Sequence, residues 1–546
     1  MNGAQIVIET LCAHGASTVF GFPGASVLPI YDELYKNADR IRHILTAHEQ
    51  GAAHAADGYA RTTGKPGVVI ATSGPGATNL ITGIANAYLD SVPMIAITGN
   101  VAMPLYGRDS FQEVDTVGIT QPIVKHSYVA RETEELEEIL CEAFEIATSG
   151  RPGPVLVDIP KNVQTSECAY IGAPSAHKEK KPRVFDTERA AEAIARSARP
   201  FIYAGGGVIA SGAELELRTL AEKISAPVGL SMMGLTALPG DYRLNLGMCG
   251  MHGKYSASAA QSECDVMIAL GVRFSDRATG NTGTYSQEKT IIHVDIDQAE
   301  IGKNVSAQIE ICGDIKDVLT ELLKKLPPQQ RDAWVKRVEE LKRAEKYSET
   351  GAFKPRDVIA TVSRYCDDDT VIATDVGQHQ MWVTQYYCFK KPRTLMTSGG
   401  LGAMGFGLGA AIGSSIAGNR KKTVLFTGDG SFGMNLIELA TAVTQKLPIV
   451  ILILNNNALG LPRQWQNMFH ESRYSQTTLD RKTDFVALAK AFGCYGYAAA
   501  TVPELESIME KLPDDLPTVI DCHIDTDEKA FPMIPPGGSV NSILWA

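Results

Sequence analysis

The chain has 546 residues, a formal net charge of −11 and a pI near 5.6, with 44% hydrophobic and 21% charged residues. This composition is typical of a globular protein with room for three domains of common size. The negative charge, without a run of five basic residues, argues against binding to nucleic acid or an acidic membrane and favours small-molecule partners.

Cysteine usage and the N-terminus point to a location in the cytoplasm. The ten cysteines include no C-x-x-C pair, which argues against a zinc ribbon and a disulfide framework and fits a reducing compartment. The first residues lack a basic region followed by an apolar segment, and no stretch approaches eighteen apolar residues. We therefore expect no signal peptide, transit peptide or membrane span.

The N-terminal third has the pattern of a parallel sheet covered by helices. Short apolar runs at 67–71, 93–98 and 154–159 alternate with helical patterns such as 133–148. The polar stretch 165–183 has little periodicity and is predicted to be a linker. A first domain is therefore predicted over residues 1–165.

Two more α/β units follow. Strands are predicted at 200–204, 266–272 and 290–295, within a second domain over 184–328. The charged stretch 331–347 is predicted to be an exposed connecting helix, and a third domain to cover 353–546. The fold class is α/β, with three doubly wound domains and mainly parallel sheets.

The first and third units share a pattern. Gly74-Pro75-Gly76 precedes Asn79-Leu80-Ile81 and an apolar strand, and Gly428-Asp429-Gly430 precedes Asn435-Leu436-Ile437 and another. This predicts two similar α/β folds on either side of a different one. The alternative is that turns of this kind occur in all doubly wound domains.

The clearest motif is a glycine turn with a later asparagine. After the predicted strand 423–427, the turn lets backbone N–H groups and a helix N-terminus face a phosphate. Asp429 offers a carboxylate, and Asn456, 27 residues later at the next strand's end, a neutral oxygen. These oxygens suit Mg²⁺ shared with a diphosphate. The pattern resembles the thiamine diphosphate motif; the alternative is an ordinary strand-to-helix turn.

A competing motif lies at residues 400–405, where the sequence fits G-x-G-x-x-G. A lone match is weak, and residues 393–397 before it make a poor buried strand. We interpret it as a turn that faces the cofactor and not as a dinucleotide fingerprint.

A thiamine cofactor also needs an acid from the other α/β unit, because a carboxyl group at its pyrimidine nitrogen activates it. Glu49 is the candidate, since small residues follow it and allow close packing of its helix. Taken alone, a glutamate in this position is more often a helix cap or a solvent-facing charge.

Several motifs in order resemble acetohydroxyacid synthase catalytic subunits along essentially the whole chain. They are the stretch from His48 to Arg61, Gly74 to Asn79, Phe111 to Glu113, Gly150 to Pro154, Asp375 to Gln380, and Gly428 to Asn456. The resemblance implies pyrimidine-binding, central FAD-binding and diphosphate-binding domains. It also implies a homodimer or tetramer with active sites between chains, Glu49 coming from one chain and Asp429 from the other, and a possible small regulatory subunit.

The resemblance implies roles for individual residues. Glu49 would activate the pyrimidine, Met404 would hold the cofactor bent, and Gln112 and Lys161 would line the substrate side. Arg277 would orient the carboxylate of the incoming acid, and Trp465 would shape the pocket for it. The implied Mg²⁺ ligands are Asp429, Asn456 and the Ala458 carbonyl. The implied thiamine diphosphate contacts are Ser91, Gln378, His379, Gly402, Met404, Gly430 and Ser431.

A second cofactor, FAD, is implied for the central domain. Its expected contacts fall at strand ends and turns, where nucleotides lie on open α/β sheets. They are Arg151, Gly206, Gly250, Met251, His252, Gly253, Gly271, Arg273, Asp295, Ile296, Gly313 and Asp314. Methionine as core filler and histidine as a structural residue remain the ordinary alternatives for Met404 and His252.

The resemblance implies an acetolactate synthase, which catalyses the first common step of branched-chain amino acid biosynthesis. It would decarboxylate pyruvate and transfer the two-carbon unit to pyruvate or to 2-oxobutyrate, with no net redox step at FAD. The alternatives are a pyruvate oxidase-type flavoenzyme, a relative specialised for another 2-oxo acid or dione, and an inactive cofactor-binding subunit. Three positions depart from the family pattern, namely Ala25, Pro462 and Ser275, and bear on rate and substrate preference.

Overall fold

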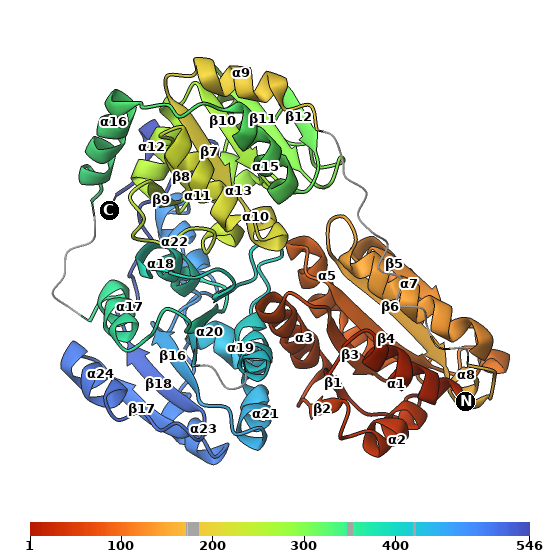
Figure 1. The fold of residues 1–546 in the computed structure, drawn as a ribbon. Helices are drawn as coiled ribbons and strands as arrows, with labels where there is room; N and C mark the ends of the chain where they lie inside the picture. The colour runs from red at the N-terminus through yellow and green to blue at the C-terminus, as the bar shows by residue number, and fades with distance from the viewer. Residues whose placement is uncertain (171, 173–184, 347–352, 419–421, 546) are drawn as a thin grey trace.

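The computed structural model describes residues 1–170, 172, 185–346, 353–418 and 422–545. It contains three six-stranded parallel sheets with helices packed against them, one after another along the chain (Figure 1). The predicted α/β class with three doubly wound domains is confirmed. Most of the predicted linker 165–183 lies outside the described residues.

The first sheet has the strand order β2-β1-β3-β4-β6-β5, and the third the order β14-β13-β15-β16-β18-β17. Counted from each domain's first strand, the two orders are the same, which confirms the prediction of two similar folds. The strands are β1 (Thr18–Phe22), β2 (Arg42–Leu45), β3 (Gly67–Ala71), β4 (Met94–Asn100), β5 (His126–Val129), β6 (Pro154–Pro160), β13 (Val371–Thr374), β14 (Leu395–Met396), β15 (Thr423–Gly428), β16 (Ile449–Asn455), β17 (Tyr495–Ala499) and β18 (Thr518–His523).

The central sheet is different, with the order β12-β11-β10-β7-β8-β9. This order reverses direction between β7 and β10, where open α/β sheets bind nucleotides. Its strands are β7 (Pro200–Ala204), β8 (Val228–Leu230), β9 (Asn245–Met248), β10 (Val266–Leu270), β11 (Thr290–Asp295) and β12 (Ile309–Cys312).

The helices fall into three groups, one for each domain. Those of the first domain are α1 (Gly3–Ala13), α2 (Leu28–Lys36), α3 (Glu49–Thr63), α4 (Pro75–Asn79), α5 (Ile81–Asp90), α6 (Thr116–Thr120), α7 (Leu136–Thr148) and α8 (Lys161–Thr165). Those of the central domain are α9 (Glu188–Arg196), α10 (Gly206–Ser211), α11 (Glu214–Lys223), α12 (Tyr255–Glu263), α13 (Asp276–Thr279), α14 (Thr282–Tyr285), α15 (Ile315–Lys325) and α16 (Asp332–Arg343). Those of the third are α17 (Pro355–Arg364), α18 (Gln378–Tyr386), α19 (Phe406–Ala417), α20 (Asp429–Asn435), α21 (Leu439–Thr444), α22 (Gly460–Phe469), α23 (Phe485–Ala491) and α24 (Val502–Met509).

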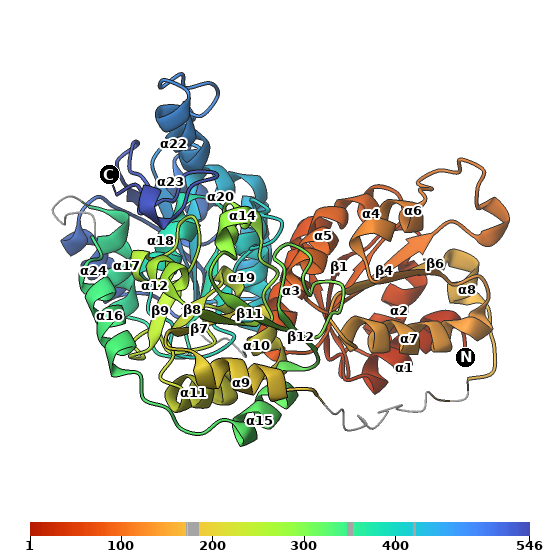
Figure 2. The same cartoon turned by 90° about the horizontal axis from the view of Figure 1, so that it is seen from above.

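Helices α3 and α19 join the first and third domains, and they lie side by side in Figures 1 and 2. A Cβ atom on Gly413 would lie 1.8 Å from the Ala55 carbonyl oxygen, and one on Gly58 2.2 Å from that of Ala410. The backbones therefore touch, and a side chain at either position would force them apart. The small residues after Glu49 thus serve helix–helix packing.

The prediction of an exposed connector at 331–347 was wrong for α16. Trp334, Val338 and Leu341 are buried on one face of this helix. The indole Nε1 of Trp334 donates to the Pro200 carbonyl at 2.9 Å, which fixes α16 against the central sheet. The charged residues that dominate the sequence occupy the other face.

Buried Asp158 in β6 provides a test of the folded core by pH. It accepts hydrogen bonds from the Thr98 hydroxyl and the Asn100 amide, each at 2.6 Å, and burial raises the pKa of its carboxyl to about 7. Because an unfolded aspartate has a pKa of about 4, the folded state binds the extra proton between these values. The stability that this protonation contributes is present at low pH and is lost as the pH rises towards 7.

We therefore expect Asp158→Asn to raise the free energy of unfolding more at pH 8 than at pH 5. The gain grows by on the order of 1 kcal/mol per pH unit between pH 5 and the folded pKa of about 7, and levels off above it. Urea unfolding of both proteins at the two pH values measures it. If Asp158→Asn changed the free energy of unfolding by the same amount at both pH values, the raised pKa of Asp158 would be contradicted.

Among the described residues, no helix has the length and apolar character needed to cross a membrane.

Candidate active site

The third sheet reverses its strand order between β13 and β15, so a crevice is expected at their carboxyl ends. After β13 come Asp375, Val376 and Gly377, and then α18 begins at Gln378. After β15, α20 begins at Asp429. Two helix N-termini therefore meet the same edge of the sheet, which is a favourable place for an anion.

His379 lies buried at this edge of the sheet, and its Nε2 atom has no hydrogen-bond partner among the described residues. Burial lowers the pKa of the imidazole to about 3, so the ring is neutral at pH 7. A buried polar nitrogen without a partner is costly unless a ligand satisfies it. The expected diphosphate contact of His379 fits this geometry.

The three expected Mg²⁺ ligands also lie at this edge. Asp429 is the first residue of α20, and burial raises the pKa of its carboxyl to about 6. Asn456 follows β16, and its Oδ1 accepts the Ala458 N–H at 3.2 Å. This hydrogen bond folds residues 456–458 into a turn. All three expected ligands offer oxygen atoms, which Mg²⁺ prefers.

Two other expected diphosphate contacts use their side chains within the protein. The Gln378 amide donates to the Gln464 side chain at 3.0 Å and to the Glu528 carbonyl at 2.8 Å, and its oxygen accepts from Asn456 at 3.3 Å. The Ser431 hydroxyl donates to the Val376 carbonyl at 2.7 Å. Sequence reasoning missed the supporting role of Gln378, because its partners lie far away in the chain.

The predicted cofactor-facing turn at 400–405 leads into α19. Gly402 has φ of +71°, and a Cβ atom there would approach only Val376, at 3.9 Å, so the space above it is open. Half-buried Met404 reaches towards α20, with its Cε 3.9 Å from the position of a Cβ on Gly430. Gly402 therefore has open space in its Cβ direction, whereas that of Gly430 is filled by Leu459 at 2.8 Å and Leu479 at 3.3 Å.

Glu49 belongs to a second cluster, at the carboxyl edge of the first sheet. It is the first residue of α3, is 8% exposed, and accepts the Asn79 side-chain amide at 3.0 Å. His48 is the helix N-cap, so the alternative of a capping role for Glu49 is excluded. Its carboxylate lies 3.2 Å from the position of a Cβ on Gly76, the second residue of α4.

Gln112 and Lys161 lie at the same edge of the first sheet. Gln112 has φ of +58° and packs over the turn after β3, with its Cα 2.9 Å from the position of a Cβ on Gly74. Exposed Lys161 is the first residue of α8, directly after β6. With Glu49, these side chains form the half-site of the first domain.

Within one chain, the two half-sites remain separate. Figure 2 shows α4 and α6 of the first domain well apart from α22 of the third. Glu438, just after α20, does reach the first domain, where it accepts the backbone N–H groups of Ala47 at 3.2 Å and His48 at 2.9 Å. This carboxylate occupies the N-terminal end of α3 within the chain, and sequence reasoning did not identify it.

The central domain presents glycine turns where its strand order reverses. Gly205 N–H donates to the Leu270 carbonyl and Gly271 N–H to the Val294 carbonyl, both at 2.9 Å, which ties the strand ends together. Gly206 begins α10, and Gly271 and Arg273 follow β10. The expected FAD residues Gly206, Gly271 and Arg273 therefore border one nucleotide-type crevice.

The loop after β9 borders the central domain and the third. His252 is buried, and burial lowers the pKa of its imidazole to about 4. Within the part of the chain that the structure describes, its Nδ1 atom has no hydrogen-bond partner. Its carbonyl accepts the Gln385 amide of α18 at 2.9 Å. The neighbouring expected contacts Gly250, Met251 and Gly253 lie in the same loop.

The remaining expected flavin contacts are partly engaged with other residues. Arg151 donates to Ser91 at 2.8 Å and pairs with Glu300 at 3.0 Å, so it joins the first domain to the central one. Asp314 is the N-cap of α15 and accepts Lys316 N–H at 3.0 Å. At the last residue of β11, burial raises the pKa of the Asp295 carboxyl to about 6. Ile296 follows it, and Gly313 N–H donates to the Asp295 carbonyl at 2.9 Å.

The two expected substrate residues come together from different domains. The exposed Arg277 guanidinium of α13 lies 5.7 Å from the ring centroid of Trp465 in α22. A cation over an indole face is an attractive arrangement, and it leaves N–H groups for a carboxylate. Nothing in the sequence separation of 188 residues indicates this contact.

Two of the three departures from the family pattern disturb the local structure little. Pro462 is the third residue of α22, where an N–H has no partner within the helix, so the proline removes no helical hydrogen bond. The Ala25 residue is exposed at the turn after β1. Gly24 is the crowded position, since a Cβ there would lie 2.5 Å from Thr72.

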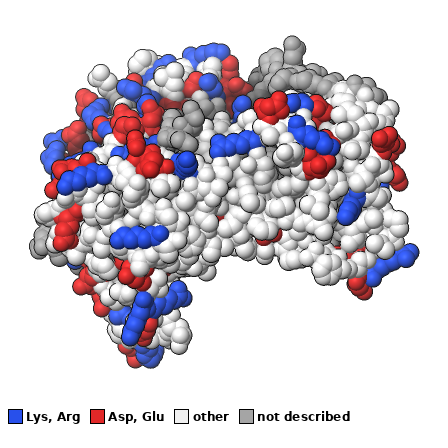
Figure 3. All heavy atoms as spheres, turned by 90° about the horizontal axis from the view of Figure 1, so that it is seen from below, with Lys and Arg blue, Asp and Glu red and all other residues white. Residues whose placement is uncertain are grey.

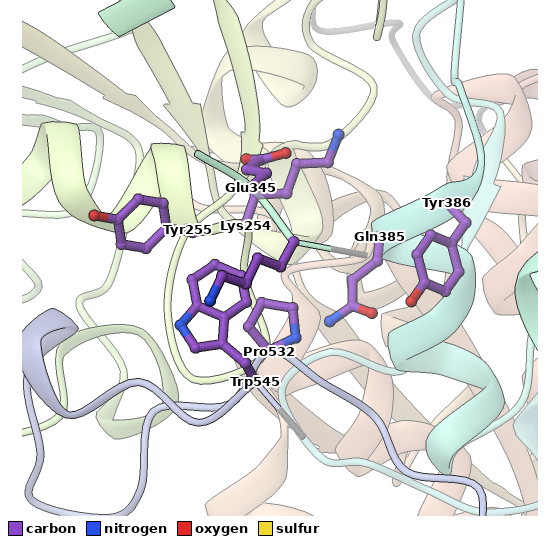
Figure 4. Close-up of a pocket in the computed structure, with 8 residues that line it drawn as sticks. Lys254, Tyr255, Glu345, Gln385, Tyr386, Pro532 and Trp545 are labelled. Atoms are coloured by element: carbon purple, nitrogen blue, oxygen red, sulfur yellow. The ribbon is translucent and has the colours of Figure 1, made fainter. Parts of the chain in front are cut away.

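Figure 4 shows a cavity elsewhere, beside α12, where the chain's C-terminal segment returns to the central domain. Trp545 lies against Tyr255, with ring centroids 5.2 Å apart. The lining residues are Lys254, Tyr255, Glu345, Lys346, Gln385, Tyr386, Pro532 and Trp545, and none is an expected cofactor or substrate contact.

Comparison with known proteins agrees with this arrangement. Models of the thiamine pyrophosphate enzyme N-terminal TPP binding domain, central domain and C-terminal TPP binding domain match residues 1–119, 187–322 and 375–522. A probable acetolactate synthase large subunit of Methanocaldococcus jannaschii is 45% identical over the whole chain and 95% of its own length. The isozyme 2 large subunit of Escherichia coli is 44% identical over the whole chain and 99% of its length. The acetolactate synthase large subunit of Lactococcus lactis is 42% identical over 98% of this chain and 95% of its own.

The matches extend through all three sheets and through each candidate cluster. The chain therefore belongs to the acetolactate synthase large subunits of the thiamine pyrophosphate enzyme family.

Proposed function

We propose that the chain decarboxylates pyruvate and joins the remaining two-carbon unit to a second 2-oxo acid. With pyruvate the product is 2-acetolactate, and with 2-oxobutyrate it is 2-aceto-2-hydroxybutyrate. The Arg277–Trp465 pair carries the proposal, because a second acid needs a carboxylate anchor and a wall for its side chain. The names of the relatives support the same activity.

Thiamine diphosphate, when bound, supplies the nucleophilic carbon and the electron sink for decarboxylation. Asp429, Asn456 and the Ala458 carbonyl would hold Mg²⁺, and the Nε2 atom of His379 would face the diphosphate. The helix N-termini of α18 and α20 stabilise negative charge at the same edge. Met404 and Gly402 would border the rings.

Glu49 would hold a proton between its carboxylate and the pyrimidine ring nitrogen, and Asn79 would keep the carboxylate oriented. Gln112 and Lys161 would line the side from which the acids enter. Since Glu49 and Asp429 are not joined within the chain, a second chain would bring its Glu49 to the Asp429 crevice of the first.

FAD suits the central domain, where the strand order reverses at glycine turns and the buried His252 Nδ1 has no hydrogen-bond partner among the described residues. In a carboligase this flavin performs no net redox step. A pyruvate oxidase-type reaction remains the competing function, and it would consume an electron acceptor.

The proposed assembly has a suitable surface. Figure 3 shows a broad band of the molecule with few charged side chains. Exposed apolar residues occur in both half-site domains, including Leu45, Phe111, Leu401 and Met434. We propose a homodimer or a dimer of dimers, and a smaller regulatory partner, since the relatives are named large subunits.

The test incubates the purified chain with pyruvate, Mg²⁺, thiamine diphosphate and FAD, and follows products by NMR together with dissolved oxygen. Acetolactate without oxygen loss is expected. Acetate or acetyl phosphate with oxygen loss would favour the oxidase reaction.

The anchor role of Arg277 makes a separate prediction. Arg277→Gln is expected to lower carboligation about tenfold with the KM of the second acid raised, because one charge-assisted carboxylate contact is lost. Steady-state kinetics with pyruvate and 2-oxobutyrate measure it. Arg218→Gln, at an exposed pair with Glu222, is the matched control. An unchanged KM in Arg277→Gln would contradict the role.

A further inference from the structure

The turn of residues 399–405, here called the cofactor turn, is held by a residue outside its own domain. Asp90, the last residue of α5, accepts the Gly400 N–H at 2.7 Å on Oδ1 and the Gly399 N–H at 3.1 Å on Oδ2. Its side chain is fully buried although both glycines are exposed. The first domain therefore fixes the start of a turn that belongs to the third.

Arg61 of α3 holds Asp90 in place. Its guanidinium donates to Asp90 Oδ2 at 2.9 Å, to Asp57 Oδ1 at 2.5 Å and to the Thr397 carbonyl at 3.1 Å. The three charged side chains are between 0% and 9% exposed. Arg61 is the shared partner of both carboxylates, so its removal would leave two buried negative charges without a cation.

The far end of the cofactor turn is held within the third domain. Gly405 N–H donates to Asp375 Oδ1 at 2.8 Å, and the Asn435 side chain donates to the Gly405 carbonyl at 2.9 Å. Between the two anchors lie Gly402, which has open space in its Cβ direction, and Met404, which reaches towards α20. The position of Met404 therefore depends on both anchors, one of which is Asp90.

We propose that Asp90 is a positioning residue for the cofactor turn, acting through the N–H groups of Gly399 and Gly400 and supported by Arg61. That thiamine diphosphate lies over Met404 rests on the proposed function. The contact between Asp90 and the cofactor turn does not. The first domain of each chain would then contribute to two active sites. Its Glu49 would face the cofactor of the partner chain, and its Asp90 would hold the turn of its own chain.

The first test is amide hydrogen exchange on the cofactor-free protein. In Asp90→Asn we expect the amides of residues 399–405 to exchange at least tenfold faster, because an amide offers the two N–H groups one oxygen in place of two. Glu438→Gln is the control, since it also changes a buried interdomain carboxylate but does not touch this turn. Exchange no faster than in the control, or faster to the same degree along the whole chain, would overturn the proposal.

Gly400→Ala tests the same contact if Asp90→Asn does not fold. The new Cβ would lie 2.9 Å from Asp90 Oδ1 and would displace the turn while Arg61 keeps its partners. The same rise in exchange is expected. Unchanged exchange at 399–405 would overturn the proposal.

The second test asks which active site Asp90 serves. Chains carrying Glu49→Gln and chains carrying Asp90→Asn are co-expressed with different tags, and the mixed dimer is purified. One of its sites then combines an intact Glu49 with an intact turn, so about half of the wild-type turnover is expected, well above either parent. A mixed dimer no more active than its parents would overturn the assignment within one chain.

The two tests separate the two proposals. If the wild-type chain forms no acetolactate, the proposed function fails, while the exchange experiment still decides whether Asp90 holds the turn. Equilibrium dialysis adds a binding measurement, with a dissociation constant for thiamine diphosphate about tenfold higher expected in Asp90→Asn than in the wild type. An unchanged constant would count against the role of the turn in cofactor binding.

Discussion

Replacing Glu49 with glutamine is expected to lower acetolactate formation by about 10²- to 10⁴-fold, the range typical of removing a positioned acid–base group. The amide keeps the shape and can still accept from Asn79 at the present 3.0 Å. It cannot exchange a proton with the pyrimidine nitrogen. The expected loss is therefore in turnover, with the affinity for thiamine diphosphate within a few-fold of the wild type.

The measurement combines turnover with equilibrium dialysis of thiamine diphosphate on the same preparation. Glu33→Gln is the matched control, because Glu33 is also a buried glutamate of the first domain but pairs with Lys36 at 2.8 Å, away from the half-site. The control should keep near-normal turnover. Near-normal turnover in Glu49→Gln itself would remove Glu49 from its proposed role.

Much of the fold could be predicted from the sequence, because buried parallel strands are short apolar runs that end at glycine or polar residues. The predicted strands 67–71, 200–204 and 290–295 agree with β3, β7 and β11 residue for residue. The error at 331–347 has a physical reason. Trp334, Val338 and Leu341 lie four and three residues apart, which is one helix face, but the charged residues between them obscured it.

The candidate site could be predicted only where one motif contains it. Asp429 and Asn456 belong to one strand–helix–strand unit, so their spacing along the chain places both residues at the same edge of the sheet. The supporting contacts could not be predicted in this way. Asp90 and Gly400 are separated by 310 residues, and their contact depends on how two domains pack. One clue was available, since Asp57 and Arg61 stand four residues apart in a helix otherwise rich in small residues.

Sequence reasoning also assigned single roles to residues that the fold uses differently. Gln378 was expected to contact the diphosphate, yet its side chain bridges Asn456, Gln464 and the Glu528 carbonyl. The diphosphate role of the Gln378 side chain stays a prediction.

Asp429→Asn is expected to change the stability of the protein in opposite directions with and without ligands. Burial raises the pKa of the Asp429 carboxyl to about 6 from about 4, so its charged form is disfavoured in the ligand-free fold at pH 7.5. The neutral amide removes this cost, and the ligand-free variant should melt a few degrees higher than the wild type.

With Mg²⁺ and thiamine diphosphate bound, the wild type should instead melt at a higher temperature than Asp429→Asn. The carboxylate then gains a divalent cation, and ligand binding stabilises the wild type by mass action. We expect the apparent dissociation constant for thiamine diphosphate in the presence of Mg²⁺ to rise at least 100-fold in Asp429→Asn, with turnover lost at ordinary cofactor concentrations. Differential scanning calorimetry and dialysis, each with Mg²⁺ and with EDTA, measure both effects.

Asp484→Asn provides the control, because Asp484 caps α23 in the same domain and asparagine caps equally well. Its melting temperature and its affinity for thiamine diphosphate should match those of the wild type, both with Mg²⁺ and with EDTA. If Asp429→Asn instead retained thiamine diphosphate as the wild type does, and Mg²⁺ stabilised both proteins equally, Asp429 would not be a metal ligand. The burial of this carboxylate would then be offset by the backbone hydrogen bonds at the start of α20 and by the charge of Arg481, both of which lower its pKa.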